Sequence, residues 1–313
     1  MVTRYFDLHC DTMTECAQRD IPLQKNQLHV NMQTVENWEH YVQCYAVWLP
    51  DDLRGEPAWQ RFLKVARRFS KEVEINKSCL TQLRDPGDLD CLEREGRHGA
   101  ILTVESGAAL GGKLEHIEDF KRLGVRMCTL TWNGATEIGR GVMAPGTTGL
   151  TDFGRKAVKA MEQAGILIDL SHASPELFWD VAEIADRPLV ASHSNAKEIC
   201  GHPRNLTKEQ FLAIRKSGGL VGLNFYKAFL NDQPEQASME DVLRHGDYLL
   251  SLGGEDILAM GGDWDGADLP SDMLGLSAIP ALYELFLRHY SETVVEKIFY
   301  GNAARVFREE NLL

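Results

Sequence analysis

Short runs of apolar and β-branched residues alternate along this chain with longer amphipathic stretches. Runs of about four to eight such residues are typical of buried strands, whereas apolar residues that recur every three or four positions indicate helices. Eight apolar runs occur, at residues 3–8, 41–49, 99–104, 125–131, 166–170, 188–192, 219–225 and 257–262. Their alternation with helical stretches predicts parallel strands joined by crossover helices.

Capping residues mark three of the helical stretches between the runs. Thr151 is suited to begin one helix as its N-cap, and Gly165 is suited to end it. Ser174 is a candidate N-cap that is followed by Pro175 at the first helical position. Thr207 precedes a third stretch in the same way. These signals place helices between the predicted strands, as crossover connections require.

The number of predicted strands indicates the fold class. Eight strands favour an α/β fold of the (β/α)8 TIM-barrel type, with an open doubly wound sheet as the alternative. No repeat, low-complexity tract or linker divides the sequence, so we expect a single domain over residues 1–313. Segment 50–98 is the least regular, and we predict that it adds helices over the top or side of that domain.

Composition and charge restrict the class of partner. The 313 residues are 44% hydrophobic and 25% charged, which suits a globular domain with a large core. Asp and Glu number 46 against 33 Lys and Arg, so the net charge is −13. Because an acidic surface repels phosphate backbones, we expect no nucleic-acid partner.

Cysteine usage and targeting signals indicate the compartment. The N-terminus lacks the features of a signal peptide, and no segment has the roughly 20 apolar residues needed to span a bilayer. The seven cysteines are scattered and include no C-x-x-C pair, which is typical of free thiols in a reducing compartment. We therefore predict a cytoplasmic protein without a membrane partner.

Polar residues end five of the predicted strands. In parallel α/β folds, ligands bind at the carboxyl ends of the strands. The residues concerned are His9 and Asp11 in the first run, Glu105 in the third, His172 in the fifth, His193 in the sixth and Asp263 in the eighth. The barrel therefore predicts that these side chains meet at one rim.

Histidine and carboxylate side chains at these strand ends are typical of a metal site. His9 and Asp11 are two positions apart, so on a strand they share one face while Cys10 points away. Nitrogen and oxygen ligands without thiolate favour Zn²⁺, Mn²⁺ or Fe²⁺. Five such ligands exceed one tetrahedral site but suit two cations that share a carboxylate, with Glu105 as the bridge. Paired metals about 3.5–4 Å apart are a recurrent arrangement for hydrolysis.

Other common motifs are absent. The stretch "GAALGGKL" at 107–114 has the glycine spacing of a phosphate-binding loop, but Leu114 stands where Ser or Thr would hold Mg²⁺. We expect it to be an ordinary loop. The sequence contains no H-E-x-x-H, G-x-S-x-G or G-x-G-x-x-G motif.

The sequence resembles the membrane (renal) dipeptidase family of metallopeptidases, among the amidohydrolase-like barrels. The likeness covers nearly the whole chain. It rests on "DLHCDT" at 7–12, "VESG" at 104–107, "LSH" at 170–172, "SHSNAKEICGHPRN" at 192–205, "GLVGLNFY" at 219–226 and "GGDWDG" at 261–266. The resemblance implies a (β/α)8 barrel, two zinc ions per subunit, a small dipeptide substrate and a homodimer.

The resemblance also implies roles for the polar residues. His9 and Asp11 match ligands of a first metal, His172 and His193 match ligands of a second, and Glu105 matches the bridge. The two cations would lower the pKa of a bridging water, and the hydroxide would attack the peptide carbonyl.

Further residues match parts of the substrate site. Asp263 matches the acid that handles the proton, and Arg204 matches the arginine that binds the substrate carboxylate. Tyr226 matches an aromatic residue near the same pocket. His202, beside Arg204, is expected to be structural.

One position departs from the family pattern. Eukaryotic members carry a histidine that helps to hold the reacting carbonyl oxygen, whereas this chain has Trp132 there. Trp132 could donate only its indole N–H, and Asn133 is a candidate substitute. This departure affects the predicted substrate more than the predicted chemistry.

Three hypotheses of function follow. The leading one is a dinuclear zinc dipeptidase, with dipeptides that carry a D-configured C-terminal residue left open as substrates. A second is another amidohydrolase, acting on N-acyl amino acids, lactams or cyclic amides. A third is a barrel that binds a small ligand without catalysis, against which the retained Asp263 argues.

Overall fold

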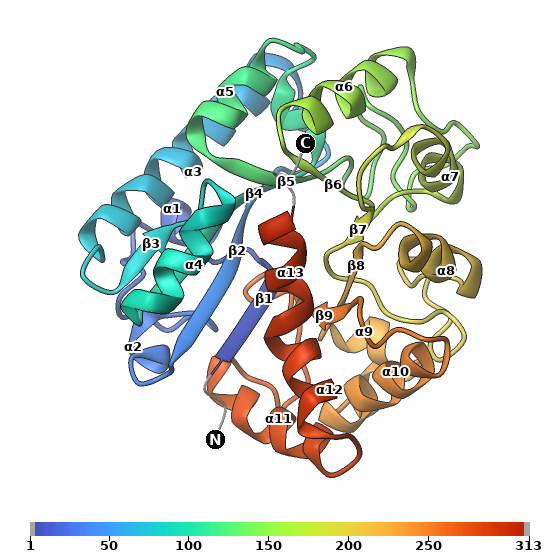
Figure 1. Cartoon of the computed structure of the whole chain (residues 1–313). Helices are drawn as coiled ribbons and strands as arrows, with labels where there is room; N and C mark the ends of the chain where they lie inside the picture. Colours follow the sequence, from blue (N-terminus) through green and yellow to red (C-terminus); the bar gives the residue numbers. More distant parts are fainter. Residues whose placement is uncertain (1–3, 310–313) are drawn as a thin grey trace.

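Eight parallel strands form a closed barrel in this computed structural model, which describes residues 4–309 (Figure 1). They are β1 (Arg4–Cys10), β2 (His40–Trp48), β4 (His98–Glu105), β5 (Val125–Thr129), β6 (Leu167–Asp169), β7 (Val190–Ala191), β8 (Leu220–Leu223) and β9 (Leu258–Met260). The pairing of β2 with β4 closes the ring. The predicted barrel is confirmed, and the open doubly wound sheet is excluded. Each predicted apolar run overlaps one strand of the barrel, although position 3 of the first run lies outside the described residues.

Segment 50–98 carries two helices and one further strand. Helices α3 (Gly55–Ile75) and α4 (Pro86–Glu95) flank β3 (Leu80–Gln82), which pairs with the start of β4 outside the ring. The sequence pattern predicts added helices but not this strand. The reason is that β3 has three residues, of which only Leu80 is fully buried, so it forms no apolar run.

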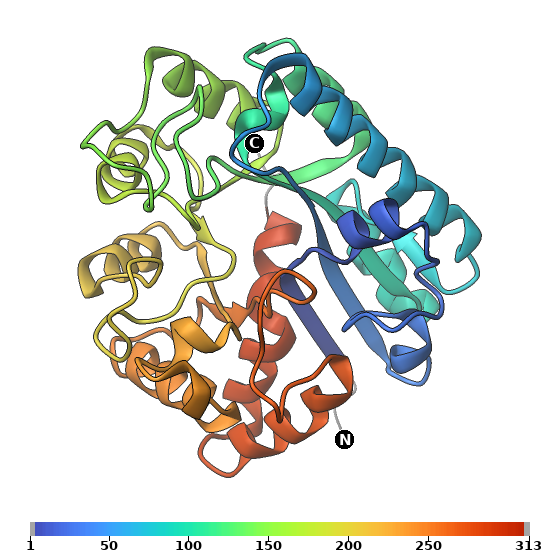
Figure 2. The ribbon, with the colours of Figure 1, turned by 180° about the vertical axis from the view of Figure 1, so that it is seen from behind.

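Helices surround the barrel in both views (Figures 1 and 2). The remaining helices are α1 (Thr12–Arg19), α2 (Met32–Val35), α5 (His116–Leu123), α6 (Asp152–Gln163), α7 (Pro175–Ile184), α8 (Lys208–Lys216), α9 (Lys227–Leu230), α10 (Met239–Ser251), α11 (Ile279–Leu287), α12 (Glu292–Glu296) and α13 (Asn302–Glu309). Short turns are η1 (Gly107–Leu110), η2 (Pro234–Gln236), η3 (Leu276–Ala278) and η4 (Lys297–Gly301). Among the described residues, no helix combines the length and apolar character needed to cross a membrane.

The predicted capping residues begin their helices. The side chains of Thr151, Ser174 and Thr207 each accept a hydrogen bond from the backbone amide three residues ahead. Pro175 occupies the first turn of α7, and Gly165 follows α6 with a φ of 75°. Local sequence thus determines where these three crossover helices begin.

An apolar cluster fills the N-terminal half of the barrel. Phe6, Ile101, Met127 and Leu220 from different strands belong to it. Helix α13 lies in front of the barrel opening in Figure 1 and adds Phe307, whose ring centroid is 5.3 Å from that of Phe6. Because this end is closed by apolar packing, polar side chains can gather only at the opposite rim.

Candidate metal centre

Six of the predicted polar residues converge at the C-terminal rim of the barrel. Their elements are β1 for His9, the turn after β1 for Asp11, the end of β4 for Glu105, and the turns after β6, β7 and β9 for His172, His193 and Asp263. All six side chains are at most 14% exposed. Such burial of carboxylates and imidazoles is costly unless hydrogen bonds, opposite charges or a metal compensate it.

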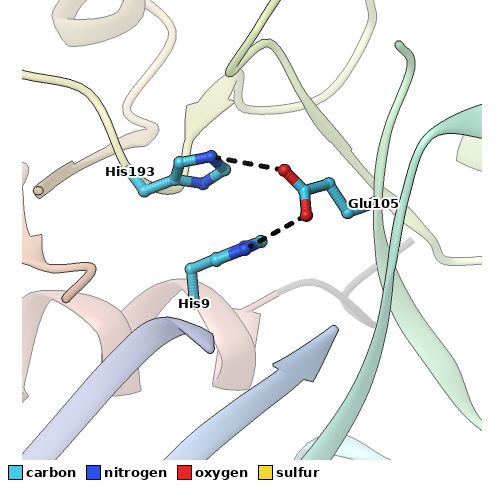
Figure 3. A group of neighbouring side chains, drawn as sticks. All are labelled: His9, Glu105 and His193. Atoms are coloured by element: carbon cyan, nitrogen blue, oxygen red, sulfur yellow. Dashed lines mark ion pairs between the residues drawn. The ribbon is translucent and has the colours of Figure 1, made fainter. Parts of the chain in front are cut away.

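The two oxygens of Glu105 face different histidines. Oε2 lies 3.5 Å from Nε2 of His9, while Oε1 lies 2.9 Å from Nε2 of His172. Oε1 is also 3.7 Å from Nε2 of His193, and Figure 3 shows His9 and His193 beside opposite oxygens of this carboxylate. Glu105 therefore has His9 at one of its oxygens (the first group) and His172 and His193 at the other (the second group).

Two buried atoms around His9 lack hydrogen-bond partners. Nε2 of His9 lies 3.8 Å from Oδ2 of Asp11 and 3.9 Å from Oδ1 of Asp263. Nε2 of His9 and Oδ1 of Asp11 are buried and have no hydrogen-bond partner. Buried polar atoms are nearly always satisfied, so these atoms fit a bound cation.

The second group consists of two histidines with aligned ring nitrogens. Nε2 of His172 and Nε2 of His193 are 3.1 Å apart. On the far side of each ring, Nδ1 of His172 is 3.0 Å from Oδ1 of Asn133, and Nδ1 of His193 is 2.7 Å from Oγ of Ser192. Donation from each Nδ1 leaves the Nε2 lone pairs free to bind a metal.

Charge is distributed unequally between the two groups. Burial alone would raise the pKa of Glu105, but His9 and His172 outweigh it and hold this pKa well below its usual range. Burial opposes the charged form of His9, yet Glu105 and Asp11 raise the pKa of His9 well above its ordinary value. Burial, followed by repulsion from Arg204, lowers the pKa of His172 to about 4. Burial and Glu105 raise the pKa of Asp11 to about 7.

The backbone turns sharply where it delivers these side chains. His172 and Asp263 have positive φ values of 68° and 57°, which are uncommon for residues other than glycine. Gly266 lies so close to the centre that a Cβ atom there would be 2.1 Å from Oδ2 of Asp11. A side chain at this position would displace a candidate ligand.

The N-terminal arm differs from the expected regular strand. Strand β1 ends at Cys10, and Asp11 is the N-cap residue of α1. The pairing register with β2 shifts between Asp7 and Cys10, which marks a bulge. Cys10 does point away, into the main apolar core. His9 and Asp11 therefore meet through the bulge and turn, not as alternate positions of one strand.

A cleft of about 520 Å³ adjoins the metal centre. Its wall includes all four residues predicted to contact substrate, which are Trp132, Asn133, Arg204 and Tyr226. Other lining residues are Thr14, Glu15, Trp48, Met143, His202, Phe229 and Asp268. Apart from Trp48, which ends β2, these residues lie on helices and loops, so the strand pattern could not have indicated them.

The sequence model of the membrane dipeptidase family, peptidase family M19, matches residues 2–313. The chain belongs to the membrane dipeptidase family. This result confirms the resemblance seen in the motifs, and the chain is a metal-dependent dipeptidase. It thereby favours the leading hypothesis over the other amidohydrolase and the non-catalytic barrel.

Relatives of this dipeptidase share its sequence and fold along most of their length. A Klebsiella pneumoniae protein known by its place in the pqqA 5′ region is 33% identical over 267 residues, covering 81% of this chain and 97% of that protein. A Rhodobacter sphaeroides metallopeptidase, solved with a phosphinate mimic of the dipeptide L-Ala-D-Ala, is 28% identical with a TM-score of 0.91, covering 98% and 99% of the two chains. The metallopeptidase dipeptidase AC is 29% identical with a TM-score of 0.92, covering 99% of each chain.

Arg204 of this dipeptidase is a buried cation without a carboxylate partner. It is 4% exposed, and its Nη2 and Nη1 donate long hydrogen bonds to the His193 carbonyl and Ser194 Oγ, at 3.3 and 3.4 Å. Among the described residues, no carboxylate forms an ion pair with it. Burial lowers the pKa of Arg204 to about 10, although Asp263 and Glu105 counteract this at longer range. A charged, buried guanidinium on a cleft wall is suited to bind an anion.

Asn224 is a residue of the site that sequence reasoning missed. Its Nδ2 donates to Oδ2 of Asp263 at 3.0 Å and to the His193 carbonyl at 3.3 Å. It follows β8, which is the direct neighbour of β9, the strand before Asp263. Its place in "GLNFY", two residues before Tyr226, was the available signal.

Proposed function

We propose that this dipeptidase binds two divalent cations in the metal centre and uses them to hydrolyse dipeptides. The observation that carries the proposal is the position of Glu105, whose two oxygens face separate histidines at 3.5 and 2.9 Å. We assign His9 and Asp11 to the first cation, His172 and His193 to the second, and Glu105 to both. The nitrogen and oxygen ligands favour Zn²⁺, with Mn²⁺ or Fe²⁺ as alternatives.

Asp263 is assigned to proton transfer. When bound, the cations would lower the pKa of a water molecule and polarise the substrate carbonyl. Asp263 then accepts the proton of the attacking water and passes it to the leaving amine. Asn224 holds one carboxylate oxygen, and burial raises the pKa of Asp263 towards the range in which a carboxylate can both accept and release a proton.

The charges of the cleft support one orientation of a dipeptide. Nη2 of Arg204 donates to the His193 carbonyl at 3.3 Å, so Arg204 lies on the side of the second cation. We assign it to the substrate's C-terminal carboxylate, with Tyr226 on the same wall. The acids Glu15 and Asp268, which also line the cleft, would meet the free α-amino group. A site that requires both charges selects dipeptides over N-acyl amino acids and lactams.

Asn133 is the candidate replacement for the family histidine. Trp132 packs edge-on against Trp48, with ring centroids 5.2 Å apart. Because Oδ1 of Asn133 accepts from Nδ1 of His172, its amide nitrogen is left to donate towards the reacting carbonyl oxygen. We assign Asn133 to this donation and Trp132 to the apolar wall of the cleft.

Substrate stereochemistry, assembly and location are further parts of the proposal. The relative solved with a mimic of L-Ala-D-Ala supports dipeptides with a D-configured C-terminal residue as substrates. The homodimer rests on the family resemblance alone. The seven cysteines are all free thiols, which supports a reducing compartment such as the cytoplasm.

Removal and return of metal would test the proposed function. The protein stripped by a chelator should lose activity, take up two Zn²⁺ ions per chain and regain turnover of L-L or L-D dipeptides. N-acetylated dipeptides and lactams, assayed in parallel, should be poor substrates. Uptake of one ion, or turnover of the acylated compounds alone, would contradict the proposal.

Arg204→Ala should selectively lower kcat/KM for dipeptides with a free C-terminal carboxylate. We expect kcat/KM for dipeptides to fall about 10- to 100-fold, since a hydrogen bond to a charged group contributes about 1.5–3 kcal/mol. Dipeptide C-terminal amides, which lack the carboxylate, should be little affected. Arg61→Ala is the matched control, because Arg61 packs behind the cleft residue Trp48 without lining the cleft itself, and it should leave the ratio of the two substrates unchanged. Equal losses on both substrates in Arg204→Ala would exclude carboxylate binding.

A further inference from the structure

Two buried aspartates flank the metal centre without belonging to it. Asp7 on β1 and Asp169 on β6 are both 0% exposed. Among the described residues, neither forms an ion pair. Burial of an unpaired carboxylate is costly unless hydrogen bonds satisfy it, so the partners of these two groups indicate their use.

Asp169 is bonded to the residues that precede both histidines of the second group. Its Oδ1 accepts from the backbone amides of Ser171 and Ser192, each at 2.9 Å. These serines stand immediately before His172 and His193. One carboxylate thereby fixes the two turns that present the candidate ligands.

Ser192 extends this contact to the ring of His193. Its Oγ donates to Oδ2 of Asp169 at 2.6 Å and lies 2.7 Å from Nδ1 of His193. A hydroxyl has one hydrogen, so once it donates to Asp169 its oxygen must accept from the Nδ1–H of His193. The chain from Asp169 through Ser192 therefore fixes the tautomer of His193 in which Nε2 is free.

Asp7 performs the corresponding task on the other side. Its Oδ1 accepts from the backbone amide of His9 at 2.9 Å, across the bulge in β1. Its Oδ2 accepts from the Gly262 amide at 3.1 Å and from Nε1 of Trp264 at 3.0 Å. Gly262 and Trp264 flank Asp263, whose own amide donates to the His9 carbonyl at 3.2 Å.

We propose that Asp169, acting through Ser192, and Asp7 are positioning residues, each for one half of the metal centre. Asp169 orients His172 and His193, whereas Asp7 orients His9 and the turn that carries Asp263. This inference rests on the proposed dinuclear function. Its consequence is that the two metal sites can be weakened one at a time, by changes that touch no ligand.

Zinc titration against a competing chelator would test the proposal through Ser192→Ala. Loss of such a supporting contact typically weakens a metal site about 10- to 100-fold. We expect the zinc affinity of one site to fall by this factor, while the zinc affinity of the other site stays within about threefold of wild type. Asp169→Asn should have the same selectivity, and Asp7→Asn should weaken the other site.

The same titrations in a variant that lacks one ligand identify which of the two sites is weakened. His193→Ala removes a ligand of the second site, so the remaining ion reports on the first site. In this background Ser192→Ala should leave zinc affinity unchanged, whereas Asp7→Asn should lower it. Weakening of the remaining site by Ser192→Ala would overturn the assignment of Asp169 and Ser192 to one half.

Thr129→Val is the control for a purely structural effect. Thr129 Oγ1 donates to the same Oδ2 of Asp169, at 2.5 Å, and among the described residues its side chain forms no hydrogen bond with a candidate ligand. We expect it to lower Tm about as much as Ser192→Ala while both zinc affinities stay at wild-type values. If Ser192→Ala also leaves both affinities unchanged in a protein that binds two zinc ions, the positioning proposal fails. If the wild-type chain itself does not bind two ions, the proposed function fails.

Discussion

Replacing Glu105 with glutamine is expected to remove tightly bound metal from both sites and to lower kcat/KM for dipeptides roughly 10³-fold or more, since the cations supply several kcal/mol of transition-state stabilisation. The reason is geometric. One carboxylate oxygen faces His9 at 3.5 Å and the other faces His172 at 2.9 Å. An amide replaces one of these oxygens by an NH₂ group, which cannot bind a cation. No other described carboxylate faces both groups of ligands.

Metal analysis after dialysis, together with dipeptide turnover, would measure this effect. Glu15→Gln is the matched control, because Glu15 also lines the cleft but pairs with Arg19 instead of a histidine. It should keep two metal ions and change mainly KM. A Glu105→Gln protein that held two zinc ions at wild-type affinity would refute the bridge.

The barrel could be predicted because its strands are buried on both faces. All eight residues of β4 are buried, so the strand forms a continuous apolar run that stands out between amphipathic helices. β3 lacked this signal because two of its three residues are only half-buried. Burial on both faces, more than strand propensity, determined which strands the sequence made visible.

The ligands could be predicted because charge is unusual at the end of a buried strand. His9, Glu105 and His193 each stand at the end of one of the predicted apolar runs. The contacts that support the ligands were not visible in the same way. Asp169 meets Ser192 across 23 positions of sequence, through the pairing of β6 with β7.

Asp7 shows the same limit within a single motif. In "DLHCDT", Asp7 is as polar as Asp11 and lies within the strand, but the sequence analysis assigned it no part in the chemistry. The structure agrees that it faces away from the cleft, towards Tyr5 and Trp264. A bulge follows Asp7, and no sequence periodicity predicts it. This bulge separates Asp7, which supports the candidate ligands, from Asp11, whose carboxylate faces the metal centre.

Replacing Asp263 with asparagine is expected to leave the metal content intact and to lower kcat about 10²- to 10⁴-fold, the usual contribution of a positioned acid or base. Asparagine has nearly the same shape, and Asn224 can still bond to its side-chain oxygen. What is lost is the ability to take a proton from water and return it to the leaving amine. KM should therefore change much less than kcat.

The pH profile distinguishes proton transfer from a structural effect of this substitution. The active form of Asp263 is the ionised carboxylate, so wild-type kcat should fall as pH drops through its pKa, which burial raises. The residual activity of Asp263→Asn should lack that acidic limb. Asp265→Asn is the matched control, because Asp265 also lines the cleft but is bonded to Thr12 and His29. It should lower Tm while retaining the limb, and an unchanged kcat in Asp263→Asn would remove Asp263 from the mechanism.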